Sequence, residues 1–107
     1  MMKQTQRDTA PESAVQDLAQ ALLALESKEE MMSFLKDLCT PQEITALAER
    51  WRVAQILHEG DLSYREIHDQ TGASLGTIVR VARFLKDEQN QGYTTAITKI
   101  TKKRSQS

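Results

Sequence analysis

The sequence predicts an all-α fold of about six helices, and three observations support this. Apolar residues repeat at helical spacing along most of the chain, and no useful run alternates as a strand would. Helix-breaking residues are few, with four Gly and two Pro. Ser or Thr stands three residues before Glu at several points, which is the capping-box signature of a helix start. With 107 residues, one domain with a modest core is expected.

The N-terminal part of the chain predicts a polar arm followed by two helices. Residues 1–11 are polar and aperiodic, so we expect a disordered arm. The segment 12–26 has apolar residues at the i, i+3, i+4, i+7 spacing of an amphipathic helix. A second helix is expected to begin with a capping box of Ser27 and Glu30 and to continue to Leu38.

The third predicted helix has the clearest start in the chain. Thr40 is a good N-cap, Pro41 suits the first helical position, and Glu43 completes a capping box. This helix should end near His58, before Gly60. Its apolar residues cover most of its circumference, which is typical of a central helix.

Residues 63–86 predict two helices joined by a tight turn. Ser63 and Glu66 form a further capping box, and Gly72 suits a left-handed C-cap that keeps the fourth helix short. Ser74 can cap a fifth helix that runs to Lys86. A short helix, a turn containing Gly and a second helix form the helix-turn-helix motif.

The two helices of this motif need a small shared core. Ile67 on the first should face Ile78 and Val81 on the second, and Ala73 can pack beneath the turn. The same arrangement also occurs as a plain packing unit, so the pattern alone leaves both interpretations open. His68 stands where many such motifs have a small residue, so the packing there must differ or the side chain must reach out.

The C-terminal segment predicts a weak helix, because residues 93–103 are rich in Thr. We therefore expect the folded domain to span 12–103 and residues 104–107 to form a disordered basic tail.

The N-terminal end of the second helix of such a motif reads base edges in the major groove. Small residues there allow close approach, and basic side chains can supply phosphate or guanine contacts. The predicted DNA-binding residues are Ser63, Tyr64, Arg65, His68, Ser74, Leu75, Gly76, Thr77, Val79, Arg83 and Lys86.

The net charge of −1 hides an uneven distribution. Residues 1–49 carry four basic and nine acidic side chains, whereas residues 50–86 carry six basic and four acidic. The basic surplus thus lies in the same part of the chain as the motif, so the near-neutral total does not argue against DNA binding. Cys39 is the one cysteine, so no disulfide can form within the chain and a cytoplasmic location is expected.

The sequence predicts neither an enzyme nor a metal protein. It shows no nucleophile–base pair, phosphate loop or carboxylate dyad, and His58 and His68 have no partners at metal-ligand spacing. No cofactor is expected, and no segment approaches the ~20 apolar residues that span a membrane, so no membrane partner is expected either.

A stretch upstream of and through the motif, LCTPQEITALAERWRVAQILHEGDLSYREIHDQTGASLGTIVRVARFLK, resembles the Trp repressor superfamily. It is most similar to the YerC/YecD-like subgroup, and its most specific parts are DLCTPQEITALAER, EGDLSYREI and TGAS-x-x-TI-x-RV. The resemblance implies six helices in an intertwined homodimer, with one helix-turn-helix of each subunit on a double-stranded DNA operator. It also implies that Arg65 reaches a guanine edge.

The resemblance also implies a place for a small effector. Arg50, Arg80, Thr40 and Thr77 match the family's effector-binding residues. Val81 and Phe84 put bulk where the family has a glycine and a serine, and Asp37 replaces a leucine. Overpacking costs about 1–3 kcal/mol, which argues against tryptophan co-repression. A different small effector, or none, stays open.

The sequence thus predicts a sequence-specific, DNA-binding transcriptional regulator, a repressor, that acts as a homodimer. The alternative is a helical dimeric protein–protein adaptor that has lost DNA binding. Retention on DNA that falls steeply with salt would separate the two.

Overall fold

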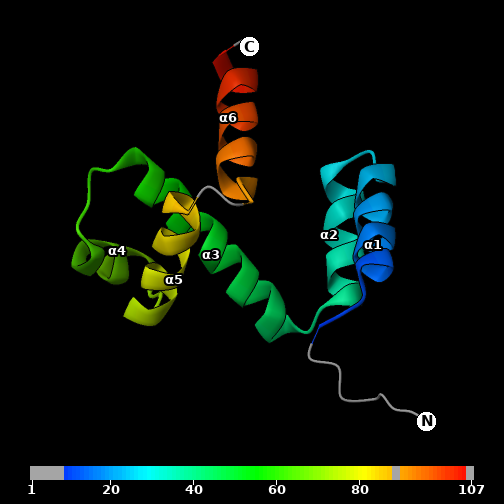
Figure 1. Cartoon of the computed structure of the whole chain (residues 1–107), viewed down its shortest axis with the longest axis horizontal. Helices are drawn as coiled ribbons and strands as arrows, with labels where there is room; N and C mark the ends of the chain where they lie inside the picture. Colours follow the sequence, from blue (N-terminus) through cyan, green and yellow to red (C-terminus); the bar gives the residue numbers. More distant parts are fainter. Residues whose placement is uncertain (1–8, 88–89, 106–107) are drawn as a thin grey trace. The chain divides into compact units, whose positions relative to one another are not determined.

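The computed structural model describes residues 9–87 and 90–105, and these form six α-helices without a strand (Figure 1). The chain divides into two compact units, Met1–Thr40 and Pro41–Ser107. The all-α prediction is confirmed. Most of the arm expected at 1–11 lies outside the described residues, and Thr9 to Pro11 are not helical.

The N-terminal unit is a helical hairpin of α1 (Glu12–Ala24) and α2 (Lys28–Leu38) (Figure 1). The first helix ends two residues before the predicted end at 26, where Leu25 turns extended and its N–H bonds to the Leu22 carbonyl. Neither helix has a buried side chain. The hairpin therefore has no core of its own.

The cap of α2 is as predicted on one side and shifted on the other. The Ser27 hydroxyl accepts a hydrogen bond from the Glu30 N–H at 3.1 Å. The Glu30 carboxylate accepts from the N–H of Glu26 at 2.8 Å, one residue earlier than in a capping box. The helix start is thus correctly predicted, although its carboxylate satisfies a neighbouring donor.

The C-terminal unit is built on α3 (Pro41–Glu59), which contacts α4 (Tyr64–Thr71), α5 (Leu75–Lys86) and α6 (Gly92–Ser105). Figure 1 shows α4 and α5 as a pair beside α3. The central position predicted for the third helix is confirmed. None of the helices in the described residues is long and apolar enough to cross a membrane.

The core of this unit joins all four helices and the turn between α4 and α5. As predicted, Ile67 packs with Ile78 and Val81, and all three are fully buried together with Ala73. The complete buried cluster is Val53, Ala54, Ile67, Ala73, Ile78, Val81 and Ile97. Because this core fixes α4 against α5, it determines which faces of the two helices remain at the surface.

The helix α6 is longer than the sequence predicted. It runs to Ser105, so Arg104 and Ser105 are helical rather than part of a disordered tail from 104. Buried Ile97 anchors the helix, and the basic residues Lys102, Lys103 and Arg104 suit the negative end of the helix dipole. Residues 106–107 of the expected tail lie outside the described residues.

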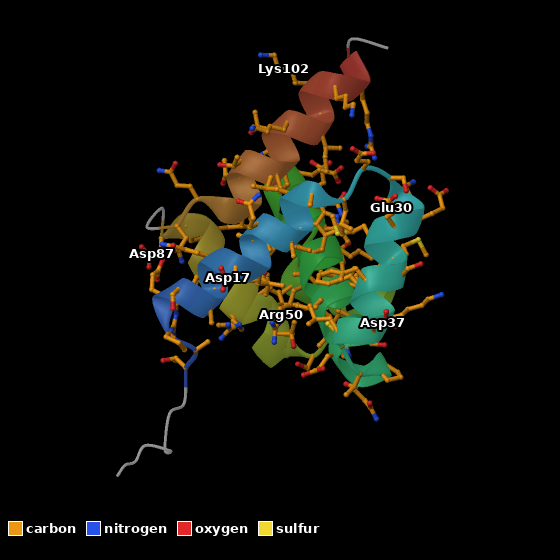
Figure 2. The ribbon with its side chains drawn as sticks, turned by 90° about the vertical axis from the view of Figure 1, so that its right-hand side faces the viewer. Asp17, Glu30, Asp37, Arg50, Asp87 and Lys102 are labelled. Atoms are coloured by element: carbon orange, nitrogen blue, oxygen red, sulfur yellow. The ribbon has the colours of Figure 1, made fainter. Side chains whose placement is uncertain are left out.

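Charge is segregated between the two units. Figure 2 shows Asp17 on α1, Glu30 and Asp37 on α2, and Lys102 near the C-terminal end of α6. The helix α6 carries four basic side chains and no acidic one, whereas the segment 12–38 carries six acidic and two basic. The acidic charge that balances the total therefore lies outside the helix-turn-helix.

Candidate nucleic-acid interface

The start of α4 is held by the predicted capping box. The Ser63 hydroxyl accepts from the Glu66 N–H at 3.1 Å, and the Glu66 carboxylate accepts from the Ser63 N–H at 2.8 Å. The backbone N–H of Ser63, and then its side chain, hold the pKa of the Glu66 carboxyl below its ordinary value. The box therefore stabilises the fold above that ordinary value and weakens as the pH falls through the lowered one.

The turn between α4 and α5 has the predicted backbone conformation. Gly72 has φ of 78°, in the left-handed region that glycine enters without steric cost, and its N–H bonds to the His68 carbonyl at 2.9 Å. The sequence interpretation missed Thr71. Its hydroxyl donates to the Ile67 carbonyl at 2.7 Å and accepts from the Ala73 N–H at 3.0 Å. A Thr directly before a C-cap Gly is the signal that points to such a bond.

The start of α5 is capped by Ser74, as predicted. Its hydroxyl accepts from the Thr77 N–H at 3.1 Å and donates to the Thr77 hydroxyl at 3.1 Å. These two predicted DNA-binding side chains therefore first define where α5 begins. Any DNA contact they make comes in addition to this role.

The helix α5 presents three different faces, since successive residues advance by about 100°. One face is buried and holds Ile78, Val81 and Ala82. A second face, which we call the outer face of α5, is exposed and consists of Leu75, Gly76, Val79, Arg83 and Lys86. The third face carries Thr77, Arg80 and Phe84. The outer face thus combines a residue without a side chain, two apolar residues and two cations.

The eleven predicted DNA-binding residues all lie on α4, α5 and the residues that cap them. Ten are exposed and Thr77 is half-buried, so their accessibility is compatible with a shared surface. On the outer face, Leu75 and Val79 remain 54% and 49% exposed despite being apolar. A Cβ added at Gly76 would meet only the Ser74 hydroxyl, at 3.8 Å. The start of α5 is therefore open.

The third face of α5 lines a hollow of about 300 Å³. Three of the six residues predicted for an effector site meet there, namely Arg50 on α3 (labelled in Figure 2) and Arg80 and Phe84 on α5. The guanidinium carbon of Arg80 lies 5.0 Å from the centroid of the Phe84 ring, at cation–π distance. Residues 90–93 complete the wall. No sequence signal singled them out, because they belong to a connection without a motif.

The other predicted effector residues do not line this hollow. Val81 is fully buried in the core, because it follows Ile78 by three residues and so lies on the same helix face. Its bulk fills the core, and Phe84 is the side chain that occupies the hollow. Thr77 lies outside the wall, at the capped start of α5. Thr40 belongs to the N-terminal unit.

Comparison with known proteins agrees with this architecture. The family model described as Trp repressor protein matches residues 13–101. The chain is 40% identical over 90 residues to the uncharacterized protein YerC of Bacillus subtilis (strain 168), a match that covers 84% of this chain and 85% of that protein.

Two solved structures are also similar. A TrpR-like protein from Eubacterium eligens ATCC 27750 is 39% identical with a TM-score of 0.77, over 83% of this chain and 90% of that one. A candidate Trp repressor from Staphylococcus aureus is 36% identical with a TM-score of 0.77, over 85% and 89%. The resemblance read from the sequence is thus confirmed, and the chain belongs to the Trp repressor family, a family of DNA-binding regulators.

Proposed function

We propose that this protein is a sequence-specific transcriptional repressor that binds a double-stranded DNA operator as a cytoplasmic homodimer. The observation that carries the proposal is the outer face of α5. It is exposed, it begins with Gly76, and it is held by a core on the opposite side of the same helix. A helix presented in this way can enter the major groove while its buried face keeps the motif rigid.

The side chains of the outer face suit contact with DNA. Gly76 lets the backbone approach the base pairs, and exposed Leu75 and Val79 can contact thymine methyl groups. Arg83 and Lys86 lie in the last turn of α5, where they can reach phosphates. The face thus provides apolar base contacts at its start and positive charge at its end.

Selection of genomic fragments is the experiment that tests this function. The protein would be incubated with fragments of its source genome, and the retained fragments would be sequenced. We expect enrichment of a site with two related half-sites, because a two-fold dimer presents two reading helices. Retention without any enriched sequence would contradict sequence-specific binding.

The two basic side chains at opposite ends of the motif should have different roles. Arg65→Ala, at the exposed start of α4, is expected to lower the ratio of operator to random-DNA affinity, since one bidentate guanine contact contributes about 1–3 kcal/mol of discrimination. Lys86→Ala should weaken both affinities alike and flatten the salt dependence by about one per lost contact in each subunit. Fluorescence anisotropy at several salt concentrations measures both effects, and identical behaviour of the two variants would contradict the assignment.

The homodimer is supported by the hairpin of α1 and α2. Neither helix has a buried side chain, and Val15, Leu18, Leu23 and Met32 remain between 39% and 79% exposed. Apolar surface of this extent on helices without a core favours burial against a second chain. We expect light scattering at micromolar concentration to give twice the 12.1 kDa mass of one chain. A folded monomer would contradict the homodimer.

Tryptophan is not expected to act as the co-repressor. The Phe84 ring already occupies the hollow beside Arg50 and stacks against Arg80, so an added indole would have to displace it. Titration of the protein with L-tryptophan in a calorimeter should give no saturable heat below millimolar concentration. A micromolar site would show that the hollow accepts the amino acid despite Phe84.

The adaptor alternative is favoured by one observation, the exposure of the apolar Leu75 and Val79 on the outer face of α5. Such residues could equally contact a partner protein. The salt dependence of DNA retention separates the two functions, because phosphate contacts release counterions and an apolar protein interface does not.

A further inference from the structure

His68 makes a bond that ties the two helices of the motif together. Its Nδ1 atom lies 2.7 Å from the backbone oxygen of Ala73, five residues further along the chain. A carbonyl oxygen only accepts hydrogen bonds, so Nδ1 must carry the proton and donate it. The neutral Nδ1–H tautomer and the imidazolium ion can both make this bond, whereas the Nε2–H tautomer cannot.

Ala73 is held by α4 at both of its polar backbone atoms. Its N–H donates to the Thr71 hydroxyl at 3.0 Å, and its oxygen accepts from His68. Its side chain is fully buried in the core beneath the turn. Because Ala73 directly precedes Ser74, the N-cap of α5, these bonds fix the point at which α5 leaves the turn.

We infer that His68 is a positioning residue for DNA reading, which acts by holding Ala73 so that the start of α5 keeps its place against α4. The inference rests on the proposed function, since it concerns the same helix. Leu75 and Gly76 follow the cap immediately, so a shift at Ala73 moves the part of the outer face that meets the bases. The ring thus takes a place where a small residue would leave the Ala73 oxygen without this donor.

The rival explanation is a direct contact between the exposed His68 ring and DNA. Two substitutions distinguish these roles, because each reproduces one ring nitrogen. In His68→Asn the amide nitrogen stands near the position of Nδ1, so it can donate to Ala73. In His68→Gln the amide nitrogen stands near the position of Nε2 instead. Asn therefore preserves the bond to Ala73, and Gln preserves a contact made by the far side of the ring.

Nitrogen NMR of the imidazole tests the bond without DNA. At a pH where the ring is neutral, we expect the signal of a protonated Nδ1 and an unprotonated Nε2. In His68→Ala, amide exchange at Gly72, Ala73 and Ser74 should accelerate, while circular dichroism keeps the helical signal of the parent. A neutral Nε2–H tautomer, or unchanged exchange in the variant, would overturn the inference.

Fluorescence anisotropy on selected and random DNA tests the consequence for reading. His68→Asn should retain the ratio of the two affinities within about twofold, and His68→Gln and His68→Ala should lower it about tenfold. Retention by Gln with loss by Asn would establish direct contact instead, and equal ratios for all variants would overturn the positioning role. If the parent protein itself does not prefer selected DNA, the proposed function fails, and the NMR experiment then decides alone whether the bond exists.

Discussion

Gly76→Glu is expected to abolish operator binding while the dimer stays folded. Gly76 is the second residue of α5 and lies on its outer face, where a carboxylate would meet the phosphates and base edges of the groove. Like charges at an interface cost several kcal/mol, so affinity should fall by more than about a hundredfold. Glu in the first turn also suits the positive end of the helix dipole, so α5 itself should not unfold.

Two matched variants separate this effect from simpler ones. Gly76→Ala adds only a Cβ, which would lie 3.8 Å from the Ser74 hydroxyl in ordinary contact, so it should bind far better than Gly76→Glu. Thr98→Glu places the same charge on an exposed position of α6 and should bind operator nearly as the parent does. Anisotropy measures binding and circular dichroism monitors folding. Parent-like binding by Gly76→Glu would show that α5 is not the reading helix.

Ile78→Ala is expected to lower the free energy of unfolding by about 2–5 kcal/mol, the range for removing a large aliphatic side chain from a core. Ile78 is fully buried in the cluster that joins α5 to the rest of the C-terminal unit. Val79→Ala is the matched control, since the neighbouring Val79 is 49% exposed and its loss should change stability by about 0.5 kcal/mol or less. Urea denaturation at one fixed protein concentration measures both, and equal losses would contradict the assigned orientation of α5.

The elements of the fold were predictable because their ends depend on local chemistry. Ser63, Glu66, Gly72 and Ser74 each act as the sequence indicates, since a cap involves residues within about four positions of one another. The contact of Ile67 with the buried face of α5 also followed from helical spacing alone. Local rules failed mainly at the two ends, where α1 stops earlier and α6 runs further than expected.

The hollow beside α5 shows what the sequence could not provide. Two lines of reasoning placed Val81 differently, because helical spacing put it in the core and the family resemblance put it at the effector site. The structure agrees with the spacing. The wall at residues 90–93 depends on where the chain returns after α5, which is a tertiary property. The bond from His68 to Ala73 likewise requires the angle of the turn, which no spacing rule supplies.

The claim that α5 reads DNA is tested most directly by the affinities of the parent protein for a selected site and for random DNA, measured by anisotropy over a range of salt concentrations. We expect the logarithm of both affinities to fall linearly with the logarithm of salt concentration, because Arg83, Lys86 and their neighbours displace counterions. The selected site should stay at least about a thousandfold tighter at physiological salt. Weak, salt-insensitive binding with equal affinity for both DNAs would contradict the account and favour the adaptor.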